Sequence, residues 1–240
     1  MQAIILAAGM STRLRPMTSA LPKPMLPIGG RPMLEYIVRQ LSSSGCEDIV
    51  ITTHYCADRI RDHFGGGSAF GARIRYAHEE TLMNTAGSLK LLECSLHDDF
   101  LVVGGNDFLP ELDLGEFINY HKNRGGIGTV AFKRLEDRSA LSLFGQGTLN
   151  ANNKLIAFEE KPLRTVSDMV HTTYQIYSPR ALEYVPAGVS CSIPEYLIRR
   201  VLAAEESIYG YVTESPFICI STPELYERAK VQMEKRRRWQ

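Results

Sequence analysis

Residues 1–18 of the chain are MQAIILAAGMSTRLRPMT, and residues 21–41 are LPKPMLPIGGRPMLEYIVRQL. The apolar run from Ala3 to Leu6 predicts a buried strand. Three small residues and a polar, basic turn follow this strand directly, and a second basic residue, Lys23, stands between two prolines. The chain thus opens with a strand whose carboxyl end is followed by small residues and by spaced cations.

The turn after this strand has the features that bind a polyphosphate. Small residues let backbone N–H groups approach a phosphate closely, and fixed cations neutralise its charge. The residues concerned are Ala7, Ala8, Gly9, Ser11, Thr12, Arg13 and Lys23. We interpret the stretch as the binding site of a nucleoside triphosphate, and we expect the rest of the chain to supply a base pocket, a metal site and a second substrate.

Composition excludes several classes of protein. Lysine and arginine number 27, as do aspartate and glutamate, so the formal net charge is zero and no nucleic-acid partner is expected. The five cysteines form no C-x-x-C pair, which argues against a disulfide framework and a zinc finger. The sequence has no signal peptide and no run of eighteen apolar residues, so we expect a cytoplasmic protein without a membrane partner.

Short apolar runs alternate with segments of helical periodicity along the first half of the chain. Strands are expected at 3–6, 48–52, 73–77, 100–103, 127–133, 141–149, 155–159, 171–177, 208–212 and 217–220. Helices are expected from Pro32 towards Gly45, at 57–64, from near Ala86, at 114–124, from Pro179, at 193–204, and from Pro223 towards Arg238. The polar turn 150–154 separates two strands of the second half and suggests a hairpin.

This alternation predicts an α/β fold, a Rossmann-like three-layer sandwich with a mainly parallel, mixed sheet and a smaller β-rich lobe. Ligands of such sheets bind at the carboxyl ends of the strands, and both Gly9 and Asp107 follow predicted strand ends. No linker and no internal repeat separates the halves. A single domain, 1–240, with two lobes and a C-terminal helix at 222–240 is therefore expected.

Familiar phosphate-binding and catalytic signatures are missing. The sequence contains no G-x-x-x-x-G-K-[ST], no G-x-G-x-x-G turn after the first strand, no H-E-x-x-H and no G-x-S-x-G. The motifs that are present resemble the signature of the sugar-1-phosphate nucleotidyltransferases, the nucleoside-diphosphate-sugar pyrophosphorylases. They are LAAGMSTRLRPMT, LPKPMLPIGGRPMLEY, TAGSLK (85–90), the strand-end Asp107, FEEKP (158–162), YGYV (209–212) and ISTPELY (220–226). This resemblance runs collinearly over essentially the whole chain.

The resemblance implies a nucleotide-binding lobe at 1–130, an acceptor-binding lobe at 131–221, and Mg²⁺ as the cofactor. It implies that a sugar 1-phosphate attacks the α-phosphorus of a nucleoside triphosphate in line and releases pyrophosphate. The residues implied in binding the nucleotide are Leu6, Ala7, Ala8, Gly9, Ser11, Thr12, Arg13 and Gly87. Arg13, Lys23 and Asp107 are implied as catalytic, with Asp107 as the metal ligand, and Lys23, Glu160, Lys161 and Thr173 as acceptor-binding.

Departures from the family pattern gather on the acceptor and metal side. Cys219 occupies the position of the usual second metal-binding aspartate, and Mg²⁺ prefers oxygen ligands to a thiol. Thr173-Tyr174-Gln175 replaces the usual Asn-Ala-Gly, and Asn106 precedes Asp107 where a glycine is common.

Two interpretations follow from the departures. In the first, the chain is an enzyme whose acceptor is unusual, such as a modified sugar or, for a cytidylyltransferase, a non-sugar phosphate or phosphonate. In the second, it is a regulatory relative that binds a nucleotide or a nucleotide-sugar without efficient turnover. The intact Arg13, Lys23, Asp107 and Lys161 favour the enzyme. The base, the acceptor and the oligomeric state, monomer or homo-oligomer, stay open at this level.

Overall fold

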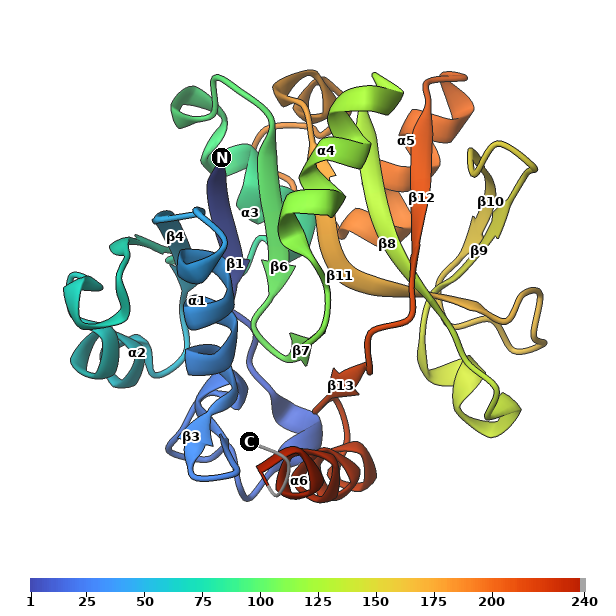
Figure 1. Cartoon of the computed structure of the whole chain (residues 1–240). Helices are drawn as coiled ribbons and strands as arrows, with labels where there is room; N and C mark the ends of the chain where they lie inside the picture. The colour runs from blue at the N-terminus through green and yellow to red at the C-terminus, as the bar shows by residue number, and fades with distance from the viewer. Residues whose placement is uncertain (238–240) are drawn as a thin grey trace. The chain divides into compact units, whose positions relative to one another are not determined.

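The chain passes back and forth between two structural units, so neither unit is one continuous segment. In the computed structural model, which describes residues 1–237 (Figure 1), the first unit contains Met1–Leu82, Val103–Pro110 and the segment from Pro216 onward. The second unit contains Met83–Val102 and Glu111–Ser215. The residues expected to bind the triphosphate belong to the first unit, except Gly87, which lies in the second. The residues expected to bind the acceptor belong to the second unit, except Lys23, which lies in the first.

Three parallel strands form the sheet of the first unit. They are β1 (Gln2–Leu6), β4 (Asp48–Thr53) and β5 (Arg73–His78), with Ala3 opposite Ile49 and Asp48 opposite Arg73. Ile4 and Ile5 are adjacent in β1 and both are fully buried, which requires that both faces of this strand are covered. A continuous apolar run is the expected pattern for such a strand, so the sequence signal for β1 has a physical cause.

Helices α1 (Met33–Ser43) and α2 (Ala57–Phe64) follow β3 (Arg31–Pro32) and β4 respectively. Figure 1 shows α1 lying across one face of the parallel strands. The expected apolar face of α1 is fully buried at Leu34, Ile37, Val38 and Leu41. Pro32 is the N-cap of α1 rather than its first residue, and α2 has the expected bounds.

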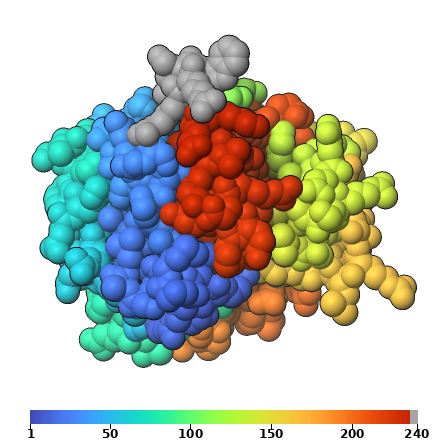
Figure 2. Space-filling view, turned by 90° about the horizontal axis from the view of Figure 1, so that it is seen from below, coloured from blue at the N-terminus to red at the C-terminus, as the bar shows by residue number. Residues whose placement is uncertain are grey.

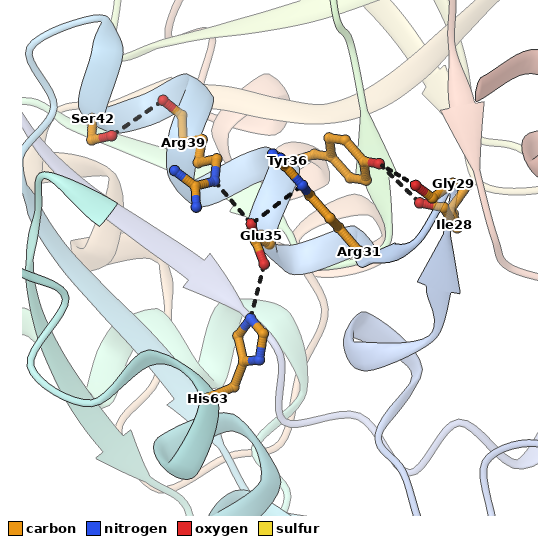
Figure 3. Close-up of polar contacts among 8 residues, drawn as sticks. All are labelled: Ile28, Gly29, Arg31, Glu35, Tyr36, Arg39, Ser42 and His63. Carbon is orange, nitrogen blue, oxygen red and sulfur yellow. Dashed lines mark hydrogen bonds and ion pairs between the residues drawn. The ribbon is translucent and has the colours of Figure 1, made fainter. Parts of the chain in front are cut away.

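A buried carboxylate, Glu35, connects α1 to α2. Its oxygens lie 2.9 Å from Arg39 Nε, 3.0 Å from His63 Nε2 and 3.8 Å from Arg31 Nε (Figure 3). Burial by itself would raise the pKa of Glu35, but the hydrogen bonds from Arg39 and His63 outweigh it and lower that pKa from its ordinary value of 4.5. Glu35 is therefore ionised and paired where an unpaired charge would destabilise the fold.

The C-terminal segment packs on the N-terminal one within the first unit. Helix α6 (Pro223–Arg237) begins after Thr222, whose Oγ1 accepts from Leu225 N at 3.3 Å, as expected of an N-cap. The Tyr226 hydroxyl donates to Pro27 O at 2.8 Å, and Figure 2 shows α6 beside the N-terminal residues. Residues 238–240 of the expected C-terminal helix lie outside the described residues.

Antiparallel pairing dominates the second unit. Strand β11 (Met169–Tyr177) pairs with β6 (Phe100–Gly104) and with β8 (Gly128–Arg134), and β12 (Ile208–Thr213) runs parallel to β8. Figure 1 shows helices α4 (Leu114–Arg124) and α5 (Ile198–Ala203) on opposite faces of this sheet. Helix α3 (Asn84–Leu91) begins two residues before the expected position.

Three of the expected elements are wrong in detail. The hairpin consists of β9 (Gln146–Leu149) and β10 (Leu155–Glu159), because residues 138–143 form a 3-10 helix that the Asp137 carboxylate caps at Ser139 N. The helix expected at 193–204 begins instead with a π turn at Ile193–Leu197, in which Leu197 N donates to Ser192 O. The helix expected after Pro179 is a 3-10 helix, Pro179–Tyr184.

The α/β fold class with a mixed sheet is confirmed, and the lobe boundaries at 130 and 221 stay predictions about ligand binding. All five cysteines are free thiols. Within residues 1–237, no helix has both the length and the apolar composition that a membrane span needs.

Replacing Glu35 by glutamine should destabilise the protein by about 1–3 kcal/mol, because Arg39 and His63 lose the charged acceptor that this buried carboxylate provides. Since folding lowers the pKa of Glu35, its contribution to stability is present above about pH 4.5 and is lost as the pH falls below it. Urea unfolding from pH 7 to pH 3 should therefore show a shallower acid slope for Glu35→Gln than for wild type. Asp62→Asn, at an exposed position of α2, is the control and should keep the wild-type slope.

Candidate active site

The backbone at the carboxyl end of β1 is held by two hydrogen bonds after the sheet ladder ends. Ala7 N donates to Thr52 Oγ1 at 3.2 Å, and Leu6 O accepts from Gly105 N at 3.0 Å. These bonds tie the end of β1 to the end of β4 and to the segment that follows β6. The amide of Ala7 is thus used by the protein itself, while the two bonds fix where the following loop begins.

Ser11 connects the loop to the second basic residue. Its hydroxyl donates to Gly9 O at 3.2 Å and accepts from Lys23 N at 3.3 Å, and its carbonyl accepts from Thr18 Oγ1 at 2.8 Å. Ser11 also has a left-handed backbone, with φ at 55°. The polar side chain at this position therefore fixes Lys23 against the loop, twelve residues along the chain.

Two glycines near this loop have opposite reasons for lacking a side chain. A Cβ at Gly105 would lie 2.9 Å from Pro24 Cγ and 3.4 Å from Ala7 Cβ, so the backbone at Gly105 packs too closely for any other residue. A Cβ at Gly9 would meet no atom within 4 Å. Gly9 is exposed, so nothing within its own unit demands a glycine there.

Arg13 lies in a short 3-10 helix, Thr12–Leu14, that Leu14 anchors in the core. Thr12 and Arg13 are exposed, and Arg13 forms no ion pair with any of residues 1–237. Leu14 fixes the backbone at this point, and the exposed Arg13 guanidinium can therefore contact an anionic ligand.

Asp107 and Cys219 face each other across a short antiparallel pair. Strand β7 (Asp107–Phe108) pairs with β13 (Ile218–Cys219), and Asp107 is directly opposite Cys219. Both side chains are buried, at 5% exposure each. The Asn106 amide donates to Asp107 Oδ1 at 2.7 Å, and the Asn106 carbonyl accepts from Ile220 N at 3.1 Å. The structure therefore places Cys219 beside the predicted metal ligand, as the sequence pattern implied.

The Cys219 thiol is neutral in this setting. Burial raises its pKa most, and the negative charge of Asp107 raises it further, while Ser221 and the positive charge of Lys23 act in the opposite direction with smaller effect. Lys23 thus lies within electrostatic reach of the Asp107–Cys219 pair. A protonated thiol beside a carboxylate is a weak hydrogen-bond donor and a poor ligand for a hard cation.

The Glu160–Lys161 pair lies at the end of β10 in the second unit. Lys161 Nζ is 2.8 Å from Glu160 Oε1, and Lys161 has a left-handed backbone with φ at 45°. The Glu160 carboxylate lies against Gly145, where a Cβ would come within 2.6 Å of Oε2. A strained backbone at a charged pair is typical of a functional site, although side-chain packing alone can also maintain it.

Thr173 and Gly87 have clear structural settings in the second unit. Thr173 lies in an irregular stretch of β11, and its hydroxyl oxygen is buried without a hydrogen-bond partner among residues 1–237. Gly87 lies in α3, and a Cβ there would come within 2.8 Å of Val189 O. The glycine at 87 is thus required by helix packing, and its expected approach to a base stays a prediction.

Sequence reasoning found one group of site residues in each unit. The loop 6–13, Lys23, Asp107 and Cys219 lie near one another in the first unit, and Glu160 and Lys161 lie together in the second. It missed Thr52 and Gly105, which hold the loop, and the buried His171. Gly105 carried a usable signal, because two glycines precede Asn106 directly after a strand.

Asp107 offers a buried carboxylate as a possible ligand for Mg²⁺. Residues 1–237 contain no group of three or more His, Cys, Asp or Glu side chains that could hold a metal ion. One buried carboxylate is nevertheless a normal protein contribution where substrate phosphates and water complete an octahedral shell. The residues therefore fit a magnesium ion that arrives with a nucleotide, and they do not form a closed metal cage.

Comparisons with known proteins identify the family and the fold of the chain. The model of the nucleotidyl transferase family matches residues 2–195. A mannose-1-phosphate guanylyltransferase of Mycobacterium tuberculosis is 29% identical over 232 residues, which are 96% of this chain and 64% of that protein. A UTP–glucose-1-phosphate uridylyltransferase of Synechocystis is 32% identical over 201 residues, covering 78% of this chain and 52% of that protein. The chain thus spans about half to two thirds of the length of these relatives.

A solved structure confirms the fold. The crystal structure of a putative glucose-1-phosphate thymidylyltransferase from Bacillus anthracis, in complex with a sucrose, has a TM-score of 0.86. The alignment covers 96% of this chain and 94% of that one at 24% identity. At this level of identity the likeness concerns the fold alone.

Gly9 and Gly105 provide a matched test of the loop. Gly9→Ala should leave the free energy of unfolding within about 1 kcal/mol of wild type, because the added methyl group meets no protein atom. It should weaken nucleoside triphosphate binding, measured by calorimetry, because a ligand phosphate that approaches the backbone would meet this methyl group. Gly105→Ala should instead destabilise the protein by about 1–3 kcal/mol through overpacking against Pro24. Unchanged nucleotide affinity in Gly9→Ala would remove Gly9 from the site.

Proposed function

The chain belongs to the nucleotidyl transferase family, and on that premise we propose that it transfers a nucleoside monophosphate from a nucleoside triphosphate to a sugar 1-phosphate or a related phosphorylated acceptor. The products are a nucleotide-activated sugar and pyrophosphate. The two relatives described above are named as sugar-phosphate nucleotidyltransferases, and these names support the proposed reaction. A cytoplasmic location, the lobe roles of 1–130 and 131–221, and homo-oligomer formation remain predictions.

One observation carries the proposal for this chain. The Ser11 hydroxyl joins the glycine loop after β1 to the backbone of Lys23, and Lys23 lies within electrostatic reach of Asp107 and Cys219. Defined hydrogen bonds thus join an open backbone position to the backbone of a cationic residue, and the charge of that residue acts on the thiol opposite the buried Asp107 carboxylate. These are the groups that nucleotidyl transfer needs around a triphosphate.

Charge stabilisation is the main catalytic task in this reaction. The attacking oxygen belongs to a phosphate that is already anionic, so neither a general base nor a covalent intermediate is required. Arg13 and Lys23 would stabilise the negative charge that develops on the α-phosphate, and Lys23 would also contact the acceptor phosphate. Leu6, Ala7, Ala8, Gly9, Ser11, Thr12 and Gly87 would bind the nucleotide.

Magnesium would be held by Asp107 together with phosphate oxygens and water. The ion supplies charge neutralisation and orientation of the phosphates when bound. Members of the family generally use divalent metal ions, and a single carboxylate suits Mg²⁺ that enters with its nucleotide. Asn106 donates to one oxygen of Asp107 and so orients this buried carboxylate.

Glu160, Lys161 and Thr173 would contact the acceptor. Glu160 offers carboxylate oxygens to hydroxyl groups, and Lys161, which is about half exposed, offers an ammonium to a phosphate. Thr173 contributes a buried hydroxyl whose oxygen lacks a partner among residues 1–237. A polyhydroxylated monophosphate suits this combination of groups better than an apolar acceptor does.

Pyrophosphate release tests the proposal directly. Each of ATP, CTP, GTP, UTP and dTTP should be combined with glucose 1-phosphate, mannose 1-phosphate and a set of non-sugar phosphates and phosphonates, with Mg²⁺ present. We expect release with at least one triphosphate and one sugar 1-phosphate. Release only with a non-sugar acceptor would favour the cytidylyltransferase alternative. Tight nucleotide binding without release from any pair would favour the regulatory alternative.

Arg13→Ala should reduce kcat by about 10²–10³-fold, because the guanidinium acts on charge that develops in the transition state. The exposed, unpaired position of Arg13 implies that the unfolding transition stays at the wild-type temperature. Arg15→Ala, two residues away and also exposed, is the matched control and should lose much less activity. Comparable turnover in Arg13→Ala and wild type would exclude the role assigned to Arg13.

Cys219→Asp should place a second carboxylate opposite Asp107. Two carboxylates at adjacent buried positions repel each other, so the variant should unfold at a lower temperature without metal and gain more than wild type from added Mg²⁺. Cys219→Asn adds a similar volume without charge and should lack the gain. Thermal unfolding over a Mg²⁺ titration measures both effects. Equal Mg²⁺ responses in wild type and Cys219→Asp would show that position 219 does not contact the metal.

A further inference from the structure

His171 is a buried side chain in β11 that no part of the nucleotide grip uses. It is 8% exposed, and its Nε2 has no hydrogen-bond partner among residues 1–237. Its ring packs edge-on against Phe158, with centroids 5.5 Å apart, and its backbone N donates to Gly145 O at 2.8 Å. A buried polar atom without a partner is rare in folded proteins, and each case calls for an explanation.

Gln175 acts on the His171 ring and raises the pKa of His171. The Tyr177 hydroxyl donates to the Gln175 side-chain oxygen at 2.7 Å and fixes the orientation of that amide. Nε2 of His171 is the ring nitrogen that is buried without a hydrogen-bond partner among residues 1–237.

Burial keeps this ring neutral. Desolvation lowers the pKa of His171 more strongly than the negative charge of Glu160 and the Gln175 hydrogen bond raise it, and Lys161 lowers it further. Nε2 of a neutral ring needs one hydrogen-bond partner, and a ligand hydroxyl suits it because a hydroxyl can both donate and accept.

The strand itself is irregular at this point. In the pairing of β11 with β8, His171 is opposite Phe132 and Gln175 is opposite Val130, so the three residues 172–174 of β11 lie opposite the single residue 131 of β8. Thr173 is the middle one of the three, and its Oγ1 is the second buried side-chain atom of β11 that has no hydrogen-bond partner among residues 1–237. Bulges of this kind are frequent next to active sites, because they redirect side chains out of the sheet pattern.

Charged groups for the same ligand lie beside His171. The register of the β9–β10 hairpin places Glu160 next to Gly145, whose carbonyl accepts from the His171 amide. Glu160 and Lys161 both act electrostatically on His171. A carboxylate, an ammonium and two unpartnered polar atoms therefore gather at one end of this sheet within the second unit.

We propose that His171 selects the acceptor through a hydrogen bond between Nε2 and one hydroxyl group of a sugar 1-phosphate. The inference rests on the proposed function, since it names a contact to the acceptor of that reaction. In the same proposal Thr173, two residues further along β11, binds another hydroxyl of the sugar through Oγ1. An acceptor that lacks the first hydroxyl leaves Nε2 buried without a partner and is discriminated against for that reason.

Two substitutions separate the ring nitrogens of His171. The amide of asparagine reproduces Nδ1 but has no atom at Nε2, whereas the longer glutamine places a polar atom near Nε2. His171→Asn should raise KM for the sugar 1-phosphate about tenfold and leave KM for the triphosphate unchanged. His171→Gln should recover much of the loss. A purely structural role would change the unfolding temperature of both variants and would not single out the acceptor.

Monodeoxy derivatives of glucose 1-phosphate and mannose 1-phosphate identify the hydroxyl. One derivative should bind wild type weakly, and for this derivative His171→Asn should cause no further loss, as expected when the two changes remove the same hydrogen bond. Independent losses for every derivative would overturn the proposal. So would unchanged KM values in His171→Asn, which would indicate that a buried water serves Nε2.

Calorimetry and NMR test the contact between His171 and the sugar independently of whether the protein catalyses nucleotidyl transfer. In wild type labelled with ¹⁵N-histidine, the Nε2 resonance of His171 should shift on addition of a sugar 1-phosphate but not of a triphosphate alone. Binding that depends on His171 without pyrophosphate release would overturn the proposed function and support this inference. Turnover of a sugar 1-phosphate without a shift at Nε2 would do the reverse. Binding of no sugar 1-phosphate would overturn both.

Discussion

The backbone groups at the end of β1 must find partners where the sheet ladder stops, and this constraint organises the first unit. Thr52 and Gly105 supply the partners, and each does so from the end of another strand. The loop that follows has its start fixed by these bonds and its far end fixed by the Ser11 hydroxyl. Because hydrogen bonds hold the loop at both ends, the backbone at Gly9 keeps a fixed position although no atom of residues 1–237 packs against it.

The charges of the candidate site follow from that arrangement. Lys23 is held against the loop through its backbone N–H, and its positive charge acts on Cys219. The candidate site contains one buried carboxylate, Asp107, and a neutral thiol opposite it, Cys219. A magnesium ion bound by this one carboxylate would need phosphate oxygens to complete its shell, so the proposed function couples magnesium binding to nucleotide binding. In the second unit, the proposal assigns the buried polar atoms of β11 to hydroxyl groups rather than to phosphate.

Local sequence signals predicted the elements well where one periodicity dominated. Helices α2 and α4 have the expected bounds, and the apolar face of α1 is buried as the spacing of its residues required. The signals failed at residues 138–143 and 193–197, where Asp137 and Ser192 side chains satisfy backbone groups and favour 3-10 and π turns. Apolar periodicity cannot report such bonds, because the capping residues are polar and lie outside the periodic segment.

The sequence by itself determined the α/β class, the phosphate-type loop after β1, and the departure at Cys219. These features depend on residue type and on spacing along the chain. Only the tertiary structure decided that Cys219 faces Asp107, that Gly105 rather than Gly9 is needed for packing, and that Nε2 of His171 is buried without a hydrogen-bond partner in the described chain, residues 1–237. Each of these depends on strand register and on close approach between distant segments, and a shift of one residue in register would move every side chain to the other face.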